Sequence, residues 1–192
     1  MPNNEDPEGA EDYLPFSEDL VDFAVAAFLE DGRWAVVSLP PHTAESLDAL
    51  LHALNQQVSE GPTLGLVGLG DEYFVLALLL GQETRLFLSN LAVSGDDRLA
   101  GELVRRGGGG IGGETGGHTG GRIDTDEEIP FGDQEILAAL GVDSFELALT
   151  CERLLAEPEL TLIDAVAPLA ARIGFGEQFA LAIERDPALD EF

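Results

Sequence analysis

The stretch that decides the fold is Tyr73-Phe74-Val75-Leu76-Ala77-Leu78-Leu79-Leu80, because every one of its side chains is apolar or aromatic. A strand that is apolar on both faces is buried on both faces in a folded sheet. The run is also far shorter than the ~20 residues that a membrane-spanning helix needs. It therefore predicts a central strand of a sheet with protein packed on both sides.

Turn signals place four more strands around this one. Asp31-Gly32 is typical of a tight hairpin, and Gly70-Asp71 and the segment 81–84 predict turns on either side of the central strand. The other predicted strands are residues 21–29, 34–39, 63–69 and 85–89. In the first of them, alternation places Val21, Phe23, Val25, Ala27 and Leu29 on one face.

Two helices accompany these strands. Thr43 is a plausible N-cap for a helix over residues 44–57, in which leucines recur at spacings of three and four. A short helix over residues 96–104 follows the last strand. The order is ββαβββα, and the short connections predict a largely antiparallel five-stranded sheet of the α+β class. This order of elements resembles the core of the roadblock and longin domains.

The composition divides the chain into five parts. Residues 1–19 carry acids and prolines but no base and predict a disordered acidic tail. Residues 20–106 form the α+β sheet domain, and residues 107–128 form a flexible glycine-rich linker that ends in acids. Residues 129–183 predict a small helical subdomain, and residues 184–192 an acidic C-terminal tail.

The helical subdomain has readable boundaries. Asp133 should cap a helix over residues 134–140, Asp143 or Ser144 should open a second, and Thr161 a third. Pro168 should kink or split the third helix, and residues 179–183 predict a last short one. The second helix carries apolar side chains at Phe145, Leu147, Leu149, Leu154 and Leu155. A bundle of this size is marginal alone, so we expect it to dock on the sheet domain or on a partner.

The charge restricts the partners. The chain has 37 acidic residues against 9 basic ones, all arginine, and a formal charge of -28. Binding to nucleic acid depends on neutralising phosphates with Lys and Arg, so direct contact with tRNA or DNA is not expected, and neither is contact with a membrane. A protein partner with a basic surface would be attracted by the same field. One cysteine and no signal peptide or spanning segment predict a cytoplasmic protein.

The residue types that usually carry catalysis do not form a motif. His42, His52 and His118 lack the spacing of a metal site, and Cys151 falls inside a leucine-rich helix, where a lone cysteine is usually buried. The predictions are therefore no catalytic residue, no cofactor and no metal ligand. Carboxylate pairs such as Asp96-Asp97 and Glu127-Glu128 are expected by chance in so acidic a chain.

Two further motifs have ordinary explanations. The glycine run 107–113 lacks the strand before it, the helix after it and the lysine that a phosphate-binding loop requires, so it is interpreted as linker. Trp34 and Tyr73 lie on predicted strands among apolar neighbours, and a base-stacking platform would need basic residues between them. We interpret both aromatic side chains as core or rim.

Several stretches together resemble the actinobacterial tRNA adenosine deaminase-associated proteins. They are residues 22–34, 71–75, 86–90, 130–142 and 172–176, and the likeness covers most of residues 22–183. The family is named for a gene beside that of the deaminase that makes inosine in the tRNA anticodon. The chain lacks the deaminase's own His-x-Glu and Pro-Cys-x-x-Cys signature, so the resemblance implies an associated protein. Its glycine-rich spacer departs from the acidic spacers expected in this family.

Three functions remain open from the sequence. The first is a non-catalytic accessory protein that binds the deaminase or another basic RNA-handling protein. The second is an enzyme that uses a carboxylate-bound divalent metal. The third is a regulator that dimerises through a roadblock-like or longin-like sheet, so a homodimer is among the expected assemblies.

Overall fold

The computed structural model describes residues 13–108 and 127–184. Its strands are β1 (Val21–Glu30), β2 (Arg33–Ser38), β3 (Thr63–Leu69), β4 (Tyr73–Leu80), β5 (Glu83–Leu88) and β6 (Phe131–Gly132). Its α-helices are α1 (Leu47–Asn55), α2 (Arg98–Gly108), α3 (Ser144–Ala156), α4 (Leu162–Ile173) and α5 (Gly176–Glu184). Short 3-10 helices are η1 (Glu18–Leu20), η2 (Pro41–Ala44), η3 (Leu91–Gly95) and η4 (Ala138–Leu140).

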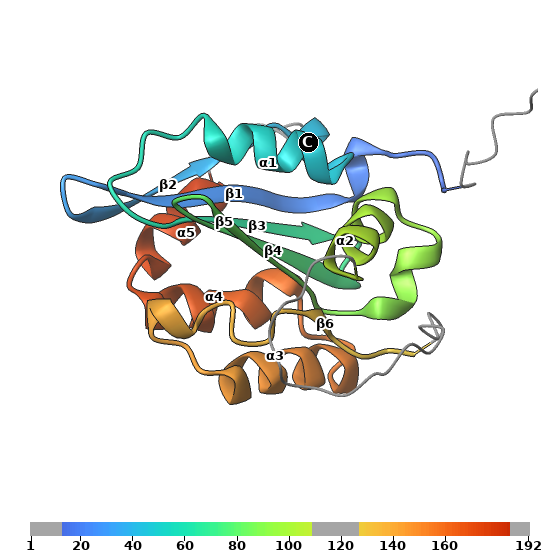
Figure 1. Ribbon diagram of the computed structural model, residues 1–192. Coiled ribbons are helices and arrows are strands. Elements are labelled where there is room, and N and C mark those ends of the chain that lie inside the picture. The colour runs from blue at the N-terminus through green and yellow to red at the C-terminus, as the bar shows by residue number, and fades with distance from the viewer. Residues whose placement is uncertain (1–12, 109–126, 185–192) are drawn as a thin grey trace, which may run out of the picture.

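All the strands of the described residues form one antiparallel sheet in the order β2-β1-β3-β4-β5-β6. Helices α1 and α2 lie on one face, and α3, α4 and α5 lie on the other (Figure 1). The α+β class and the antiparallel sheet are confirmed. The sheet has six strands where five were expected, because Phe131-Gly132 pairs with Phe87 and Leu88. A strand of two residues leaves no alternation in the sequence from which to predict it.

The sheet separates two hydrophobic cores, as the central apolar stretch predicted. β4 lies between β3 and β5, and its residues 73–78 are buried. Phe74, Leu76 and Leu78 belong to the core under the C-terminal helices, whereas Val75 and Ala77 belong to the core under α1 and α2. The buried side chains between Ile136 and Ala182 belong to the first of these cores, which they share with the sheet.

Glycines in β3 let large side chains approach the sheet from both sides. Gly65 pairs with Ala26 and Ala77, and a Cβ at Gly65 would lie 2.8 Å from a methyl carbon of Leu54 on α1. On the opposite face, a Cβ at Gly68 would collide with the ring of Phe23. That ring is itself held edge-on to Phe179 of α5, with centroids 5.6 Å apart. Small residues at the middle of the sheet therefore set how closely the helices pack.

Strand β1 departs from simple alternation at its start. The pairing with β3 shifts register between Val21 and Phe23. Phe23, Val25 and Ala27 share the face expected of them, but Val21 packs against the other core, and Leu29 belongs to neither. The expectation that all five lie on one face was wrong at Val21, because one bulged residue moves the side chain before it to the other side of the sheet.

Helix boundaries differ from the expected ones at three places. Ser46, not Thr43, caps α1, because its hydroxyl oxygen accepts the Ala49 N–H at 3.2 Å, while Thr43 donates to the Pro40 carbonyl within η2. Residues 134–140 form turns and η4 instead of a helix. α2 starts at Arg98 and continues to Gly108, later than expected at both ends.

The caps of the last helices are confirmed. The Asp143 and Thr161 side chains accept N–H groups at the starts of α3 and α4. Gly174 ends α4 in the left-handed region with φ of 114°. Pro168 lies inside α4, which is one helix from Leu162 to Ile173 and is not split.

Residues 13–19, assigned from composition to the acidic tail, lie against α2. The Leu14 N–H donates to the Asp96 carbonyl at 2.9 Å, and Phe16 packs on the core beneath α1 and α2. The remaining tail positions 1–12, most of the C-terminal tail (185–192) and most of the predicted linker (109–126) lie outside the described residues.

The close approach at Gly68 predicts a loss of stability in Gly68→Val. The new side chain must displace the buried Phe23 ring, and overpacking of a core typically costs about 1–3 kcal/mol. Urea denaturation followed by circular dichroism measures the free energy of unfolding. Gly95→Ala is the matched control, because a Cβ there meets nothing within 4 Å. Equal stability of both variants and the wild type would show that the Phe23 contact does not constrain the sheet.

Candidate interaction surface

The two histidines of the described residues lie on different elements. His42 is exposed in η2, and His52 is exposed near the end of α1, where its Nε2 lies 2.8 Å from Gln56 Nε2. His118 lies outside the described residues. Within residues 13–108 and 127–184, no group of three or more His, Cys, Asp or Glu side chains is placed to hold a metal ion.

Cys151 is buried on the inner side of α3. Burial raises the pKa of its thiol from 9.0 to about 12, because the charged thiolate is poorly solvated in an apolar core. At neutral pH the side chain is therefore a protonated thiol that packs as a small hydrophobe, not a nucleophile.

The two singled-out aromatic side chains are packed into the protein. The Trp34 ring lies 5.3 Å from the Phe175 ring and is half-buried between β2 and the C-terminal helices. Tyr73 is 4% exposed in the opposite core, and burial raises its pKa further above 10. Tyr73 therefore has no free face for a nucleobase to stack on, and Trp34 packs at the rim of the core, as expected.

Asp22 is a carboxyl group whose pKa is raised, chiefly by partial burial. Its Oδ2 accepts the Asp71 N–H at 2.9 Å, and Asp71 has a left-handed φ of 53° in the turn between β3 and β4. A raised carboxyl pKa is one sign of a general acid or base. Here the hydrogen bond connects β1 to a neighbouring strained turn, which is a structural role.

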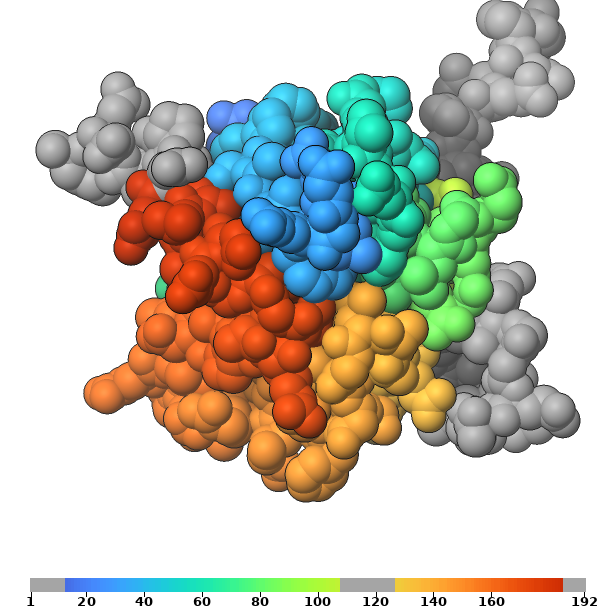
Figure 2. Space-filling view, turned by 90° about the vertical axis from the view of Figure 1, so that its left-hand side faces the viewer, coloured from blue at the N-terminus to red at the C-terminus, as the bar shows by residue number. Residues whose placement is uncertain are grey.

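A hollow lies at the tip of the β1–β2 hairpin, on the side of the molecule shown in Figure 2. It has a volume of about 490 Å³ and is lined by Glu30, Asp31, Arg33, Trp34 and Ala35. Two carboxylates and one guanidinium line it, without a histidine, a cysteine or a serine. The hollow therefore lacks a hydroxyl, thiol or imidazole nucleophile, and its ionisable groups are two carboxylates and one guanidinium.

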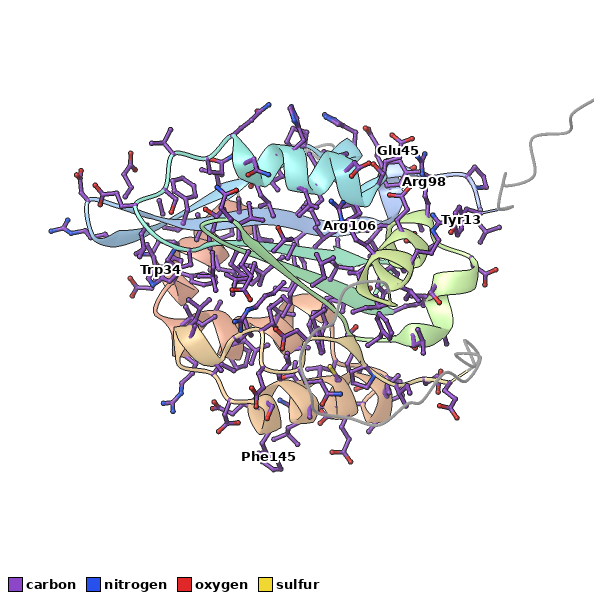
Figure 3. The ribbon with its side chains drawn as sticks, viewed as in Figure 1. Tyr13, Trp34, Glu45, Arg98, Arg106 and Phe145 are labelled. Carbon is purple, nitrogen blue, oxygen red and sulfur yellow. The ribbon has the colours of Figure 1, made fainter. Side chains whose placement is uncertain are left out.

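Arg98 and Arg106 of α2 are paired with neighbouring acids, and Figure 3 shows Arg98 beside Glu45. Arg98 Nε lies 2.8 Å from Glu102 Oε1, and its Nη1 lies 3.9 Å from Glu45. Arg106 pairs with Asp48 of α1 at 3.1 Å. Glu102 also accepts the Leu47 N–H at the start of α1, at 2.9 Å. These contacts join α1 to α2 and leave no basic stripe on this side of the described structure.

The acid excess lies on the surface. No Asp or Glu side chain of the described residues is fully buried. Arg85, Arg153 and Arg172, like the α2 arginines above, each lie within 4 Å of a carboxylate. Surface ion pairs of this kind contribute little to stability, but each one neutralises a positive charge. The described exterior is therefore a carboxylate surface on which most cations are already paired.

Helix α3 has two apolar faces. Leu147, Thr150 and Cys151 are buried, and Leu154 packs against the same core. Phe145 is 73% exposed, and Leu149 and Leu155 are each 42% exposed. In the sequence these leucines and Phe145 form one apolar pattern. A helical wheel separates this pattern into two stripes. One contains residues 147, 150, 151 and 154, which face the core, and the other contains residues 145, 149 and 155, which do not.

The fold and surface thus define a class: an α+β protein with an acidic exterior and an exposed apolar helix face. The chain belongs to the Rv3753c-like tRNA adenosine deaminase-associated protein family, whose sequence model matches residues 22–176. This confirms the family resemblance. The chain is 28% identical over 165 residues to Protein Rv3753c of Mycobacterium tuberculosis (strain ATCC 25618 / H37Rv). The aligned region covers 85% of this chain and 88% of that protein.

No solved structure matches the chain. No helix among the described residues is long and apolar enough to span a membrane.

The burial of Cys151 predicts that its thiol is protected in the folded protein. At pH 8 the thiolate population is very small because the folded-state pKa is about 12 and the thiolate is the reacting species. Ellman's reagent should therefore react slowly with the native chain and rapidly in denaturant, with the absorbance at 412 nm as the measurement. Fast reaction of the native protein, matching that of the unfolded chain, would contradict the assigned burial.

Proposed function

We propose that this protein is a non-catalytic accessory protein that binds a partner with a basic surface, and that the tRNA adenosine deaminase is the first partner to test. The observation that carries the proposal is the carboxylate exterior, in which the described arginines are largely paired with acids. Such a surface attracts cationic proteins and favours fast association with them. The family description names the deaminase.

The arrangement of chemical groups supports a non-catalytic role. His42, His52 and Cys151 lie on three different elements, and the thiol is protonated. A catalytic site needs a nucleophile or base within hydrogen-bond reach of a second group. An accessory protein needs only a stable fold and a complementary surface.

Binding to the deaminase should be measurable and should weaken with salt. Isothermal titration calorimetry of the full chain against the deaminase of the same organism should give a dissociation constant below about 100 μM at low salt. The affinity should fall as ionic strength rises from about 50 to about 500 mM, because salt screens the attraction between exposed charges. A non-binding acidic protein of similar charge serves as the control. Absence of heat at both salt concentrations would remove the deaminase as a direct partner.

The purified chain should not bind bare tRNA. Its phosphates would face a protein of charge -28, and affinity for nucleic acid depends on cations that displace the counterions of the phosphates. Fluorescence anisotropy of labelled tRNA should stay flat as the protein is added at near-physiological salt. Tight binding in this assay would overturn the electrostatic basis of the proposal.

A further inference from the structure

The exposed side chains of α3 form one continuous stripe, here called the α3 outer face. It consists of Phe145, Ala148, Leu149, Glu152, Leu155 and Ala156, all of the exposed class. Their spacings of three and four residues place them on one side of a helix. Five of the six are apolar, although α3 belongs to a strongly acidic protein. The opposite side of the same helix is buried against the core.

This stripe differs from ordinary exposure of single apolar residues. The other exposed large apolar side chains of the described residues occur one at a time on separate segments: Leu14, Leu20, Val37, Val58, Ile129 and Leu181. α3 alone brings three together, and Phe145 is the one exposed aromatic side chain of the described residues. Isolated apolar residues on a surface need no explanation, whereas a contiguous patch marks an interaction site.

The α3 outer face is accessible and rigid. α3 lies on the far side of α4 from the sheet (Figure 1), and Phe145 points away from the body of the protein (Figure 3). The Asp143 side chain caps the helix by accepting the Glu146 N–H at 2.9 Å. Leu147 and Cys151 fix its inner side in the core. A helix held in this way loses little conformational entropy on binding.

Carboxylates surround the α3 outer face. Residues 143–164 contain six acids and one base, Arg153, and that arginine pairs with Glu157 at 2.9 Å. Arg172 of α4 lies 3.7 Å from Glu146, so the two cations near the helix are both beside acids. A ligand of this face therefore meets an apolar stripe that contains one carboxylate, Glu152, with further acids in the neighbouring positions of the chain.

We infer that the α3 outer face inserts into an apolar groove of a partner protein whose rim carries Lys and Arg. An amphipathic helix in a hydrophobic groove is a common mode of recognition. Aromatic side chains such as Phe145 commonly provide the centre of such an interface, and the charged rim provides orientation and speed of association. The inference rests on the proposed accessory function and adds the surface and the chemistry of the partner.

Charge argues against a second copy as the occupant. Two copies meeting through α3 would bring the same acidic rims together, and each chain carries a charge of -28. Like charges placed opposite each other at an interface are unfavourable. The two tails of the chain beyond the described residues are no better suited. Residues 1–12 contain no Val, Leu, Ile, Phe, Tyr or Trp, and residues 185–192 would add further acids to an acidic rim.

The test is site-specific photocrosslinking in the full chain. p-Benzoylphenylalanine replaces Phe145 in one variant and Leu181 in the control, because Leu181 is 50% exposed on a different helix, α5. Both variants are expressed in the organism that encodes the protein, and crosslinked proteins are identified by mass spectrometry. We expect position 145, but not position 181, to capture a basic protein.

The captured protein and the deaminase are then purified and titrated against three chains: wild type, the double variant Phe145→Ser with Leu149→Ser, and Leu181→Ser. The double variant should lose about tenfold or more in affinity, whereas Leu181→Ser should not. Thermal melting curves of the three chains should coincide, because the substituted side chains are exposed. Coinciding curves exclude unfolding as the cause of the lost affinity.

The outcomes separate the inference from the proposed function. Crosslinks from position 145 to a second copy, to the chain's own tail or to tRNA, or no crosslink at all, overturn the docking face. A deaminase that binds the double variant as tightly as the wild type also overturns it and leaves the accessory function in place. If another basic protein is captured at position 145 and the deaminase binds none of the chains, the docking face stands and the deaminase is removed as the partner.

Discussion

The structure depends on one constraint: β3 and β4 are apolar on both faces and must be covered on both. The carbonyl and amide groups of these strands are satisfied within the sheet, so the remaining requirement is to exclude water from two surfaces. Helices α1 and α2 meet it on one side and the C-terminal helices on the other. The C-terminal segment is therefore half of the covering of the sheet. Phe23 over Gly68, held against Phe179, is the point where the two halves of the chain interlock.

The charge of the chain has little to do with this core and much to do with the surface. The fold fully buries no Asp or Glu of the described residues, so most of the acids carry little desolvation cost, with the partly buried Asp22 as an exception. Their effect is on which molecules can approach. A negative exterior disfavours polyanions and favours cationic proteins, and the pairs formed by the α2 arginines strengthen this bias by neutralising cations that would otherwise be free.

Helix α3 shows why residue patterns have to be assigned to faces. The capping residue Asp143 identifies the start of this apolar helix correctly. Only the packing shows that Leu147 and Leu154 face the core while Phe145, Leu149 and Leu155 face outward. A sequence with apolar residues on two sides of a helix predicts two contacts, and the structure supplies just one of them. The candidate interface is the contact that remains unfilled.

The sequence by itself determined the class of fold, the central strand, the tight hairpin at Asp31-Gly32, the caps at Asp143 and Thr161, and the sign of the surface charge. These features follow from local preferences and composition, which are properties of neighbouring residues. Tertiary structure alone decided the sixth strand, the bulge that moves Val21 to the other core, and which stripe of α3 meets the core. Each of these depends on contacts between segments far apart in the chain, and no local pattern encodes where a distant segment will lie.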